Sequence, residues 1–345
     1  MNIFDLGLPL DFFKDEIKQL DTDSKIVISS LNESVEWKEW YSNRLKPMLD
    51  VLNQYNFKEK YFLVNDTWNL DKDIGIEVVS INYFAILTVY ETLVKNQKTN
   101  HTWNSSLDKS LFLVGKINSL NRIGLFMKLK ELDILNKVDY SLNYPISEQI
   151  FNNSSEVYDN LISQKIVKNT NQSLSEFLNE HKNNLDNIEF VNNDETFAYK
   201  GFPYSEKIYT NTSLSIVSET NISTQWENEK PWFTEKTYRA IINKHPFICA
   251  NIPNSLLHLK KYGFHTFEEY FKHSNYNQND FNHSLNQFAE NIKYFKETFE
   301  SKKEEINQKI EDNYKKLMEL YNNFQNHKMF STEKELEKLM NSIPW

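Results

Sequence analysis

Apolar residues in the first hundred positions fall into short β-branched runs, separated by stretches with helical spacing. The runs from Ser24 to Ser30, Tyr61 to Val64 and Ile76 to Ile81 are typical of buried strands. Residues 34–55 and 82–95 place apolar side chains near one face of a helix. Strands that alternate with helices predict a parallel, doubly wound sheet, in which ligands bind at the carboxyl ends of the strands.

A polar stretch without periodicity, residues 96–109, separates this first half from a second one. The second half opens with a predicted strand from Leu111 to Val114 and a turn at Gly115. A helix is then expected from about Ser119 to Leu135. Residues 144–200 are polar and rich in Asn, and we expect short helices and loops with a peripheral role there.

The pattern from residue 204 to residue 251 predicts helix, strand, loop, helix and strand. A helix near Tyr204 leads into a strand from Leu214 to Val217. After a loop, the next helix starts near Thr234, a residue type that caps helix amino ends. It ends near Pro246, because Pro cannot continue a helix, and Phe247 to Ala250 form the next strand.

The last third of the chain predicts helices. One helix follows Pro253 and Asn254 and closes at Gly263. Residues 284–342 have the composition of long charged helices with a discontinuous apolar face. The apolar spacing is too irregular for sustained heptads, so helices that pack across two domains are favoured over an oligomerising coiled coil.

These patterns predict an α/β protein with two Rossmann-like domains that face a central cleft. The expected N-terminal domain is 1–107, the expected second domain is 108–283, and 284–345 are the C-terminal helices. A chain of 345 residues is long enough for two domains with a core each.

Charge and composition narrow the class of partner. The formal net charge is −9 and no basic run occurs, which disfavours nucleic acid without excluding a local basic patch. The single cysteine, Cys249, cannot form a disulfide within the chain, so we expect a reducing, cytoplasmic location. We expect no membrane span and no signal peptide, because no apolar stretch is long enough and the first residues carry acids early.

Arginine is scarce: of 39 Lys and Arg residues, only Arg44, Arg122 and Arg239 are Arg. Six glycines in the whole chain argue against a Gly-rich phosphate loop. Any anion site must then rely on side chains and helix amino ends. Residues that remain Arg in a Lys-rich chain are candidates for the planar, bidentate fork that phosphates favour.

Glu235 and Arg239 are four residues apart and share a helix face, which by itself describes a surface ion pair worth a few tenths of a kcal/mol. Two neighbouring features favour a ligand site instead. The helix follows a strand that ends at Glu219. In addition, a second strand-to-helix turn, where backbone N–H groups can bind an anion, carries three further polar residues. These are Lys116, Asn118 and Arg122.

The segments SIVSET and FTEKTYRAIINKHPFI resemble the donor-binding segment of two-Rossmann (GT-B type) glycosyltransferases. The likeness is to the fucosyltransferase-like group and to related uncharacterised phage and bacterial proteins. The upstream FLVGKINSLNRIGLFMKLKELDIL resembles the first strand and helix of the same domain, with Arg122 in the place of a phosphate-contacting basic residue. The resemblance covers roughly residues 110–270. The matching residues in the first two segments are Glu219, Thr234, Glu235, Lys236, Arg239 and Pro246.

The resemblance implies transfer of a sugar from a nucleoside-diphosphate sugar to a glycan, a protein or a modified nucleobase. No cofactor is implied, and no metal is required for the catalytic step. The D-x-D pairs at Asp21 and Asp71 fall in polar turns rather than at a metal site. The expected donor-binding residues are Glu219, Thr234, Glu235, Lys236, Arg239, Arg122, Lys116 and Asn118.

An inverting enzyme would need a general base from the first domain. Asp66, at the carboxyl end of a predicted strand, is the first candidate, and Glu33 is the second. Because neither stands in a motif, a catalytically silent binding or structural protein with the same fold remains the alternative.

Overall fold

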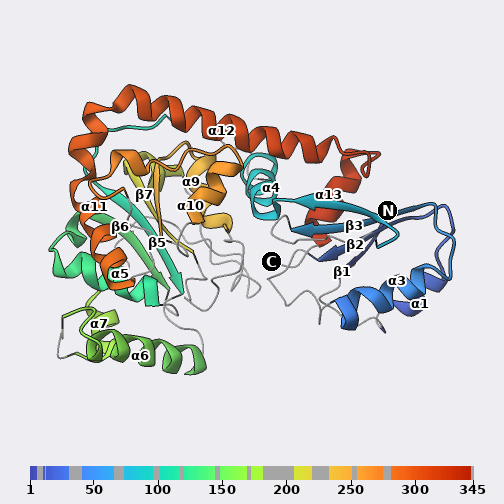
Figure 1. Cartoon of the computed structure of the whole chain (residues 1–345), viewed down its shortest axis with the longest axis horizontal. Helices are drawn as coiled ribbons and strands as arrows, with labels where there is room; N and C mark the ends of the chain where they lie inside the picture. Colours follow the sequence, from blue (N-terminus) through green and yellow to red (C-terminus); the bar gives the residue numbers. More distant parts are fainter. Residues whose placement is uncertain are drawn as a thin grey trace. The chain divides into compact units, whose positions relative to one another are not determined.

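The computed structural model of this chain shows an α/β protein with two four-stranded parallel sheets (Figure 1). The chain divides into two compact units, residues 1–90 with 319–345, and residues 91–318. Each unit contains one of the sheets, so the parallel α/β architecture predicted from the sequence is confirmed. The residues described are 1–5, 11, 13–30, 41–65, 74–95, 102–116, 120–143, 148–168, 172–181, 206–219, 233–250, 255–274 and 281–342.

The first sheet has the strand order β1-β2-β3-β4. Its strands are β1 (Asn2–Asp5), β2 (Lys25–Ser30), β3 (Glu59–Asn65) and β4 (Glu77–Ile81). Strands β2, β3 and β4 confirm the three predicted runs. Strand β1 was missed, because a four-residue strand with only Ile3 and Phe4 as apolar residues gives no clear periodicity.

The helices of the first unit are α1 (Lys14–Lys18), the π-helix η2 (Tyr41–Leu45), α3 (Lys46–Leu52), α4 (Tyr83–Val89) and α13 (Glu333–Ser342). All but the short helix α1, which was not predicted, form where the apolar spacing predicts them. The π-helix η3 (Tyr90–Lys95) continues α4, which confirms the helix expected over 82–95. Residues 41–52 confirm most of the helix expected over 34–55, and residues 34–40 lie outside the described part.

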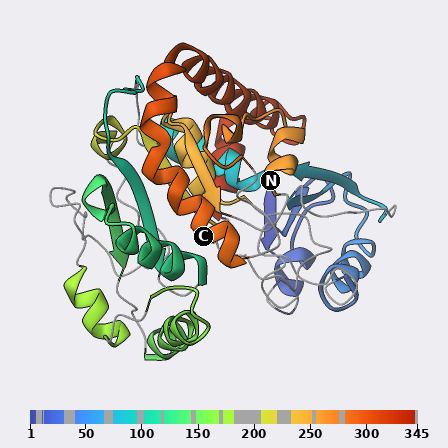
Figure 2. The ribbon, with the colours of Figure 1, turned by 60° about the vertical axis from the view of Figure 1, so that its left-hand side comes forward.

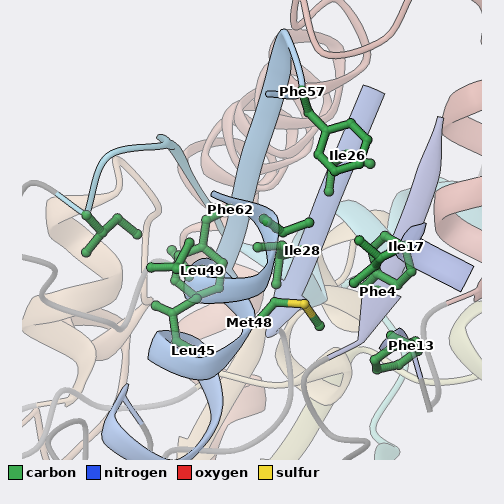
Figure 3. Close-up of a cluster of buried hydrophobic side chains, with 13 residues drawn as sticks. Phe4, Phe13, Ile17, Ile26, Ile28, Leu45, Met48, Leu49, Phe57 and Phe62 are labelled. Carbon is green, nitrogen blue, oxygen red and sulfur yellow. The ribbon is translucent and has the colours of Figure 1, made fainter. Parts of the chain in front are cut away.

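Side chains from helices α1 and α3 build the core of the first unit against one face of its sheet (Figure 3). Ile17 of α1 and Met48 of α3 lie in the same cluster as Ile28 of β2 and Phe62 of β3, and all four are fully buried. Burial of each such side chain stabilises the fold by about 1.5–3 kcal/mol.

Lys25 of β2 links the C-terminal residues of the chain to the first sheet, and its side chain is almost buried. Its Nζ donates to the carbonyl of Met329 at 2.8 Å and to Ser331 Oγ at 2.9 Å. It also lies 3.3 Å from the Glu335 carboxylate, and burial of Lys25 is possible because these acceptors replace water. Lys338 Nζ adds a bond of 2.8 Å to the carbonyl of Met1.

We expect Lys25→Met to lower the free energy of unfolding of the first unit by about 2 kcal/mol, since three acceptors lose a charged donor. Urea denaturation measures the loss. Lys58→Met is the matched control, because Lys58 is an exposed lysine of the same unit and its loss should cost less than about 0.5 kcal/mol. Equal effects of the two substitutions would contradict the role given to Lys25.

The second sheet has the strand order β6-β5-β7-β8. Its strands are β5 (Ser110–Lys116), β6 (Val138–Asn143), β7 (Leu214–Ser218) and β8 (Phe247–Ala250). Strands β5, β7 and β8 confirm the predicted runs. Strand β6 was missed: it lies at the edge of the sheet, and its sequence VDYSLN mixes buried Val138 and Tyr140 with polar residues.

The helices of the second unit surround this sheet. They are α5 (Leu120–Glu131), α6 (Glu148–Ser163), α7 (Leu174–Glu180), α8 (Glu206–Thr210), α9 (Glu235–Ile242), α10 (Ser255–Lys261) and α11 (Phe281–Ser301), with the 3₁₀ turns η4 (Leu135–Lys137) and η7 (Glu268–Tyr270). Helix α12 (Lys303–Gln325) contributes residues 303–318 to this unit and the rest to the first. Helices α5 and α11 pack side by side (Figures 1 and 2).

The connections of the second sheet reverse direction between β5 and β7. From β5 the chain passes through α5 to β6 on one side, and it then returns to β7 on the other side of β5. Because parallel crossovers are right-handed, α5 and α9 cover opposite faces of the sheet. The point where the strand order reverses is where open parallel sheets bind ligands, outside the carboxyl ends of the strands.

Candidate functional site

Glu219 directly follows β7 at this switch point and is only 1% exposed. Its carboxylate accepts hydrogen bonds from the Thr234 N–H at 3.0 Å, from the Thr234 hydroxyl and from the Thr237 hydroxyl at 2.6 Å. Its own N–H donates to the carbonyl of Ala250 at 3.0 Å. A buried carboxylate needs hydrogen-bond donors to replace the water it has lost. The bonds of Glu219 also connect the end of β7 to the start of α9.

Thr234 is the N-cap of α9, as its residue type predicts. Its hydroxyl oxygen accepts from the Lys236 N–H at 3.4 Å and from Lys236 Nζ at 3.1 Å, while the hydroxyl hydrogen goes to Glu219. One threonine therefore links the buried acid to a basic side chain. The result is a fixed helix amino end with a favourable dipole for an anion.

Glu235 opens α9 and pairs with Lys236 Nζ at 2.9 Å. Burial by itself would raise the pKa of the Glu235 carboxyl. The charges of Lys236 and Arg239, with hydrogen bonds from Lys236 and from a backbone N–H, outweigh burial and lower the pKa to about 2. Glu235 is therefore an anion at neutral pH, with 27% of its side chain exposed to a ligand.

This low pKa predicts a pH dependence. A carboxyl whose folded pKa lies below its ordinary value of 4.5 stabilises the fold above that value, and the stabilisation is lost as the pH falls towards 2. We expect Glu235→Gln to be less stable than the unsubstituted protein at neutral pH, and the difference should shrink between pH 4.5 and pH 2. Urea denaturation at a series of pH values measures it, and a constant difference would contradict the ionic role of Glu235.

Arg122 lies on α5, on the other side of the switch point, and is 4% exposed. Burial lowers the pKa of its guanidinium, while the negative charges of Glu219 and Glu235 act in the opposite direction. The three side chains are therefore close enough to share one electrostatic environment. A buried arginine with two carboxylates nearby remains a cation, because its ordinary pKa lies far above neutrality.

The described side chains of the site carry an excess of positive charge. Arg122, Lys236 and Arg239 supply three cations, and Glu219 and Glu235 supply two anions, so the formal sum over these five residues is +1. Lys236 and Arg239 also line a small pocket on strands β5 and β7, whose floor includes Leu111 and Ile216. Its volume of about 20 Å³ holds a water molecule but not a nucleotide, so a ligand would extend from it rather than fill it.

Thr237 belongs to this region and was not indicated by the sequence pattern. Two further polar residues, Ser215 and His245, lie at the amino ends of β7 and β8. Thr237 reaches Glu219 from one turn into α9. His245 Nε2 lies 2.7 Å from the carbonyl of Thr212, which can only accept, so Nε2 carries the hydrogen. The Ser215 hydroxyl then donates to His245 Nδ1 at 2.8 Å. A Thr three residues after an N-cap faces the preceding strand, and this spacing is the signal that could have indicated Thr237.

The structure brings together five of the eight predicted donor-binding residues, Glu219, Thr234, Glu235, Lys236 and Arg122, through contacts or shared charge. Arg239 joins them through its charge on Glu235 and through the pocket. Lys116 ends β5, but its side chain lies outside the described part, as do Asn118 and both candidate bases, Asp66 and Glu33. The donor-binding role of all eight residues and the role of either acid as a base remain predictions.

Two further properties concern the described part of the chain. No three or more His, Cys, Asp or Glu side chains gather there in a way that could hold a metal ion. No described helix combines the length and apolarity needed to cross a membrane.

Comparison with known proteins gives only distant likenesses in structure. The sequence matches no protein-family model and no curated protein. A solved structure of an alpha,alpha-trehalose-phosphate synthase (UDP-forming) from Burkholderia vietnamiensis resembles 97% of this chain and 77% of its own, at 9% identity and a TM-score of 0.43. A likeness at that level is too distant to carry a fold or an activity from one protein to the other.

Proposed function

We propose that this protein is a glycosyltransferase of the two-domain GT-B type that takes a sugar from a nucleoside-diphosphate donor. The observation that supports the proposal most is the cluster of Arg122, Lys236 and Arg239 with two carboxylates at the switch point of a parallel sheet. Parallel sheets bind nucleotides at this position. The resemblance of the α9 segment to donor-binding segments supports the same class.

In this proposal the diphosphate lies at the amino end of α9, where Lys236 and Arg239 neutralise it. As the sugar bond breaks, negative charge grows on the departing diphosphate, and fixed cations stabilise that charge. Glu235 accepts hydrogen bonds from the two ribose hydroxyls, because it is ionised and partly exposed. In this proposal Lys236 and Arg239 neutralise the diphosphate in place of a bound metal ion. We therefore propose that the transfer does not require a metal.

Glu219 has a different task in this proposal. Its carboxylate oxygens are already used by Thr234 and Thr237, and almost none of its surface is exposed. We assign it as a positioning residue that fixes the amino end of α9 and thereby the side chains of Glu235 and Lys236. Its effect on donor binding is therefore indirect.

Calorimetric titration of the protein with UDP, GDP and inorganic pyrophosphate tests the proposal. We expect one nucleoside diphosphate to bind with a Kd below about 100 μM and to bind more tightly than pyrophosphate, because the ribose adds contacts to Glu235. Absence of binding by both nucleotides would contradict the proposal. So would equal affinity for pyrophosphate, since the site would then be a general anion site.

A further inference from the structure

A second cavity lies on the same unit, away from the switch point. It has a volume of about 360 Å³, within the range of small-molecule sites. It lies at the carboxyl end of α5 and near the amino end of the edge strand β6, whereas the nucleotide site proposed above lies at the carboxyl ends of the central strands β5 and β7. Its lining consists of Lys130, Asp133, Leu135, Asn136, Tyr140 and His181.

The wall of this cavity is held in place before any ligand arrives. Lys130 Nζ lies 3.2 Å from Glu180 and 5.2 Å from the centre of the Phe177 ring. His181 Nδ1 lies 2.8 Å from the carbonyl of Phe177, and the two rings stack at 4.6 Å. A carbonyl only accepts, so Nδ1 carries a hydrogen, and Nε2 lies 3.8 Å from the Glu180 carboxylate.

The turn on the other side is equally fixed. The N–H of Asp133 donates to the carbonyl of Lys130 at 2.9 Å, and that of Lys137 donates to Ile134 at 2.9 Å. Asp133 has a φ of 55°, a left-handed conformation that Asp, Asn and Gly accept more readily than other residues. The carboxylate of Asp133 and the amide of Asn136 are thereby presented by a rigid turn, which lowers the entropy lost on binding.

The charges around the cavity do not favour a phosphate. The charges of Lys130 and Asp133 in the lining cancel, and the positive charge of Lys130 is already paired with Glu180 beside the lining. The side-chain amide of Asn136 offers both a donor and an acceptor. A ligand with many hydroxyl groups both donates and accepts, and a carboxylate such as Asp133 can accept from two neighbouring hydroxyls.

We propose that this cavity binds a neutral saccharide, through Asp133 and Asn136 on the turn and Lys130 on α5. The site is separate from the proposed nucleotide site and does not depend on it. Aromatic Tyr140 and Leu135 supply the apolar part of the lining against which a sugar ring can pack.

Ligand-observed NMR titration with maltose, cellobiose, lactose, N,N′-diacetylchitobiose and glucose 6-phosphate tests this proposal. We expect at least one neutral disaccharide to bind in the millimolar range or more tightly. Its affinity should fall at least about tenfold in Asp133→Gly and in Asn136→Ala. Glycine accepts the left-handed conformation at 133, so the first variant should fold.

Lys137→Ala is the matched control, because Lys137 is exposed on the same turn and does not line the cavity. Arg239→Ala should also leave the saccharide affinity unchanged, which separates this result from that of the nucleotide titration. The proposal is overturned if no neutral disaccharide binds, if both cavity variants bind as the unsubstituted protein does, or if glucose 6-phosphate binds better than the neutral sugars.

Discussion

Glu219→Ala should lower the stability of the second unit by about 3–5 kcal/mol, because it removes one partner from a buried, charged network. The N–H and hydroxyl of Thr234 and the hydroxyl of Thr237 would lose their acceptor, and the positive charge of Arg122 would lose a nearby anion. Buried donors without acceptors cost about 1–3 kcal/mol each, which supports an effect of this size.

The two units need not unfold together, so a local probe is required. Hydrogen exchange measured by mass spectrometry on peptides from β7 and α9 reports the second unit alone. We expect faster exchange in both elements in Glu219→Ala and no change in β2 and β3 of the first unit.

Thr237 offers a matched pair of variants for the same network. Thr237→Ser keeps the hydroxyl that donates to Glu219, whereas Thr237→Val keeps the shape and removes the hydroxyl. Thr237→Val should reproduce part of the loss, about 1–2 kcal/mol, and Thr237→Ser should lose less. If Thr237→Val exchanged as slowly as the unsubstituted protein, Glu219 would not hold α9 in the way described.

The double variant Lys236→Ala and Arg239→Ala should lose at least about a hundredfold in affinity for the nucleoside diphosphate, because two charge-assisted contacts are removed together. It should still fold, since both side chains and Glu235 are partly exposed. Calorimetry measures the affinity, and hydrogen exchange confirms that α9 persists.

The double variant Lys137→Ala and Lys261→Ala is the control for that experiment. Both residues are exposed lysines of the second unit, so their removal matches the change in net charge without touching the site. An equal loss of affinity in the control would show that the effect comes from overall charge. An unchanged affinity in the double variant would contradict the assignment of Lys236 and Arg239.

Strands that carry a β-branched or apolar run bounded by polar residues could be predicted from the sequence. This holds for β2, β5 and β7 inside the sheets and also for the edge strand β8. The two missed strands, β1 and β6, are edge strands whose sequences, NIFD and VDYSLN, mix apolar and polar residues, so they carry a weaker signal.

The candidate site was predictable where a local rule applies. Thr234 is a helix cap by residue type, and Glu235 and Arg239 share a face by spacing. The Glu219 carboxylate accepts hydrogen bonds from two threonines because of how β7 and α9 pack in space. No local sequence pattern contains that information. The same is true of Lys25, whose partners are more than 300 residues away along the chain.

A crystal structure of the protein with the nucleoside diphosphate that binds most tightly tests the central proposal most directly. We expect the diphosphate oxygens within about 3.2 Å of Lys236 Nζ and the Arg239 guanidinium. The ribose hydroxyls should meet the Glu235 carboxylate, next to the carboxyl ends of β5 and β7. A nucleotide bound elsewhere on the protein, with Lys236 still paired only with Glu235 and Thr234, would contradict it.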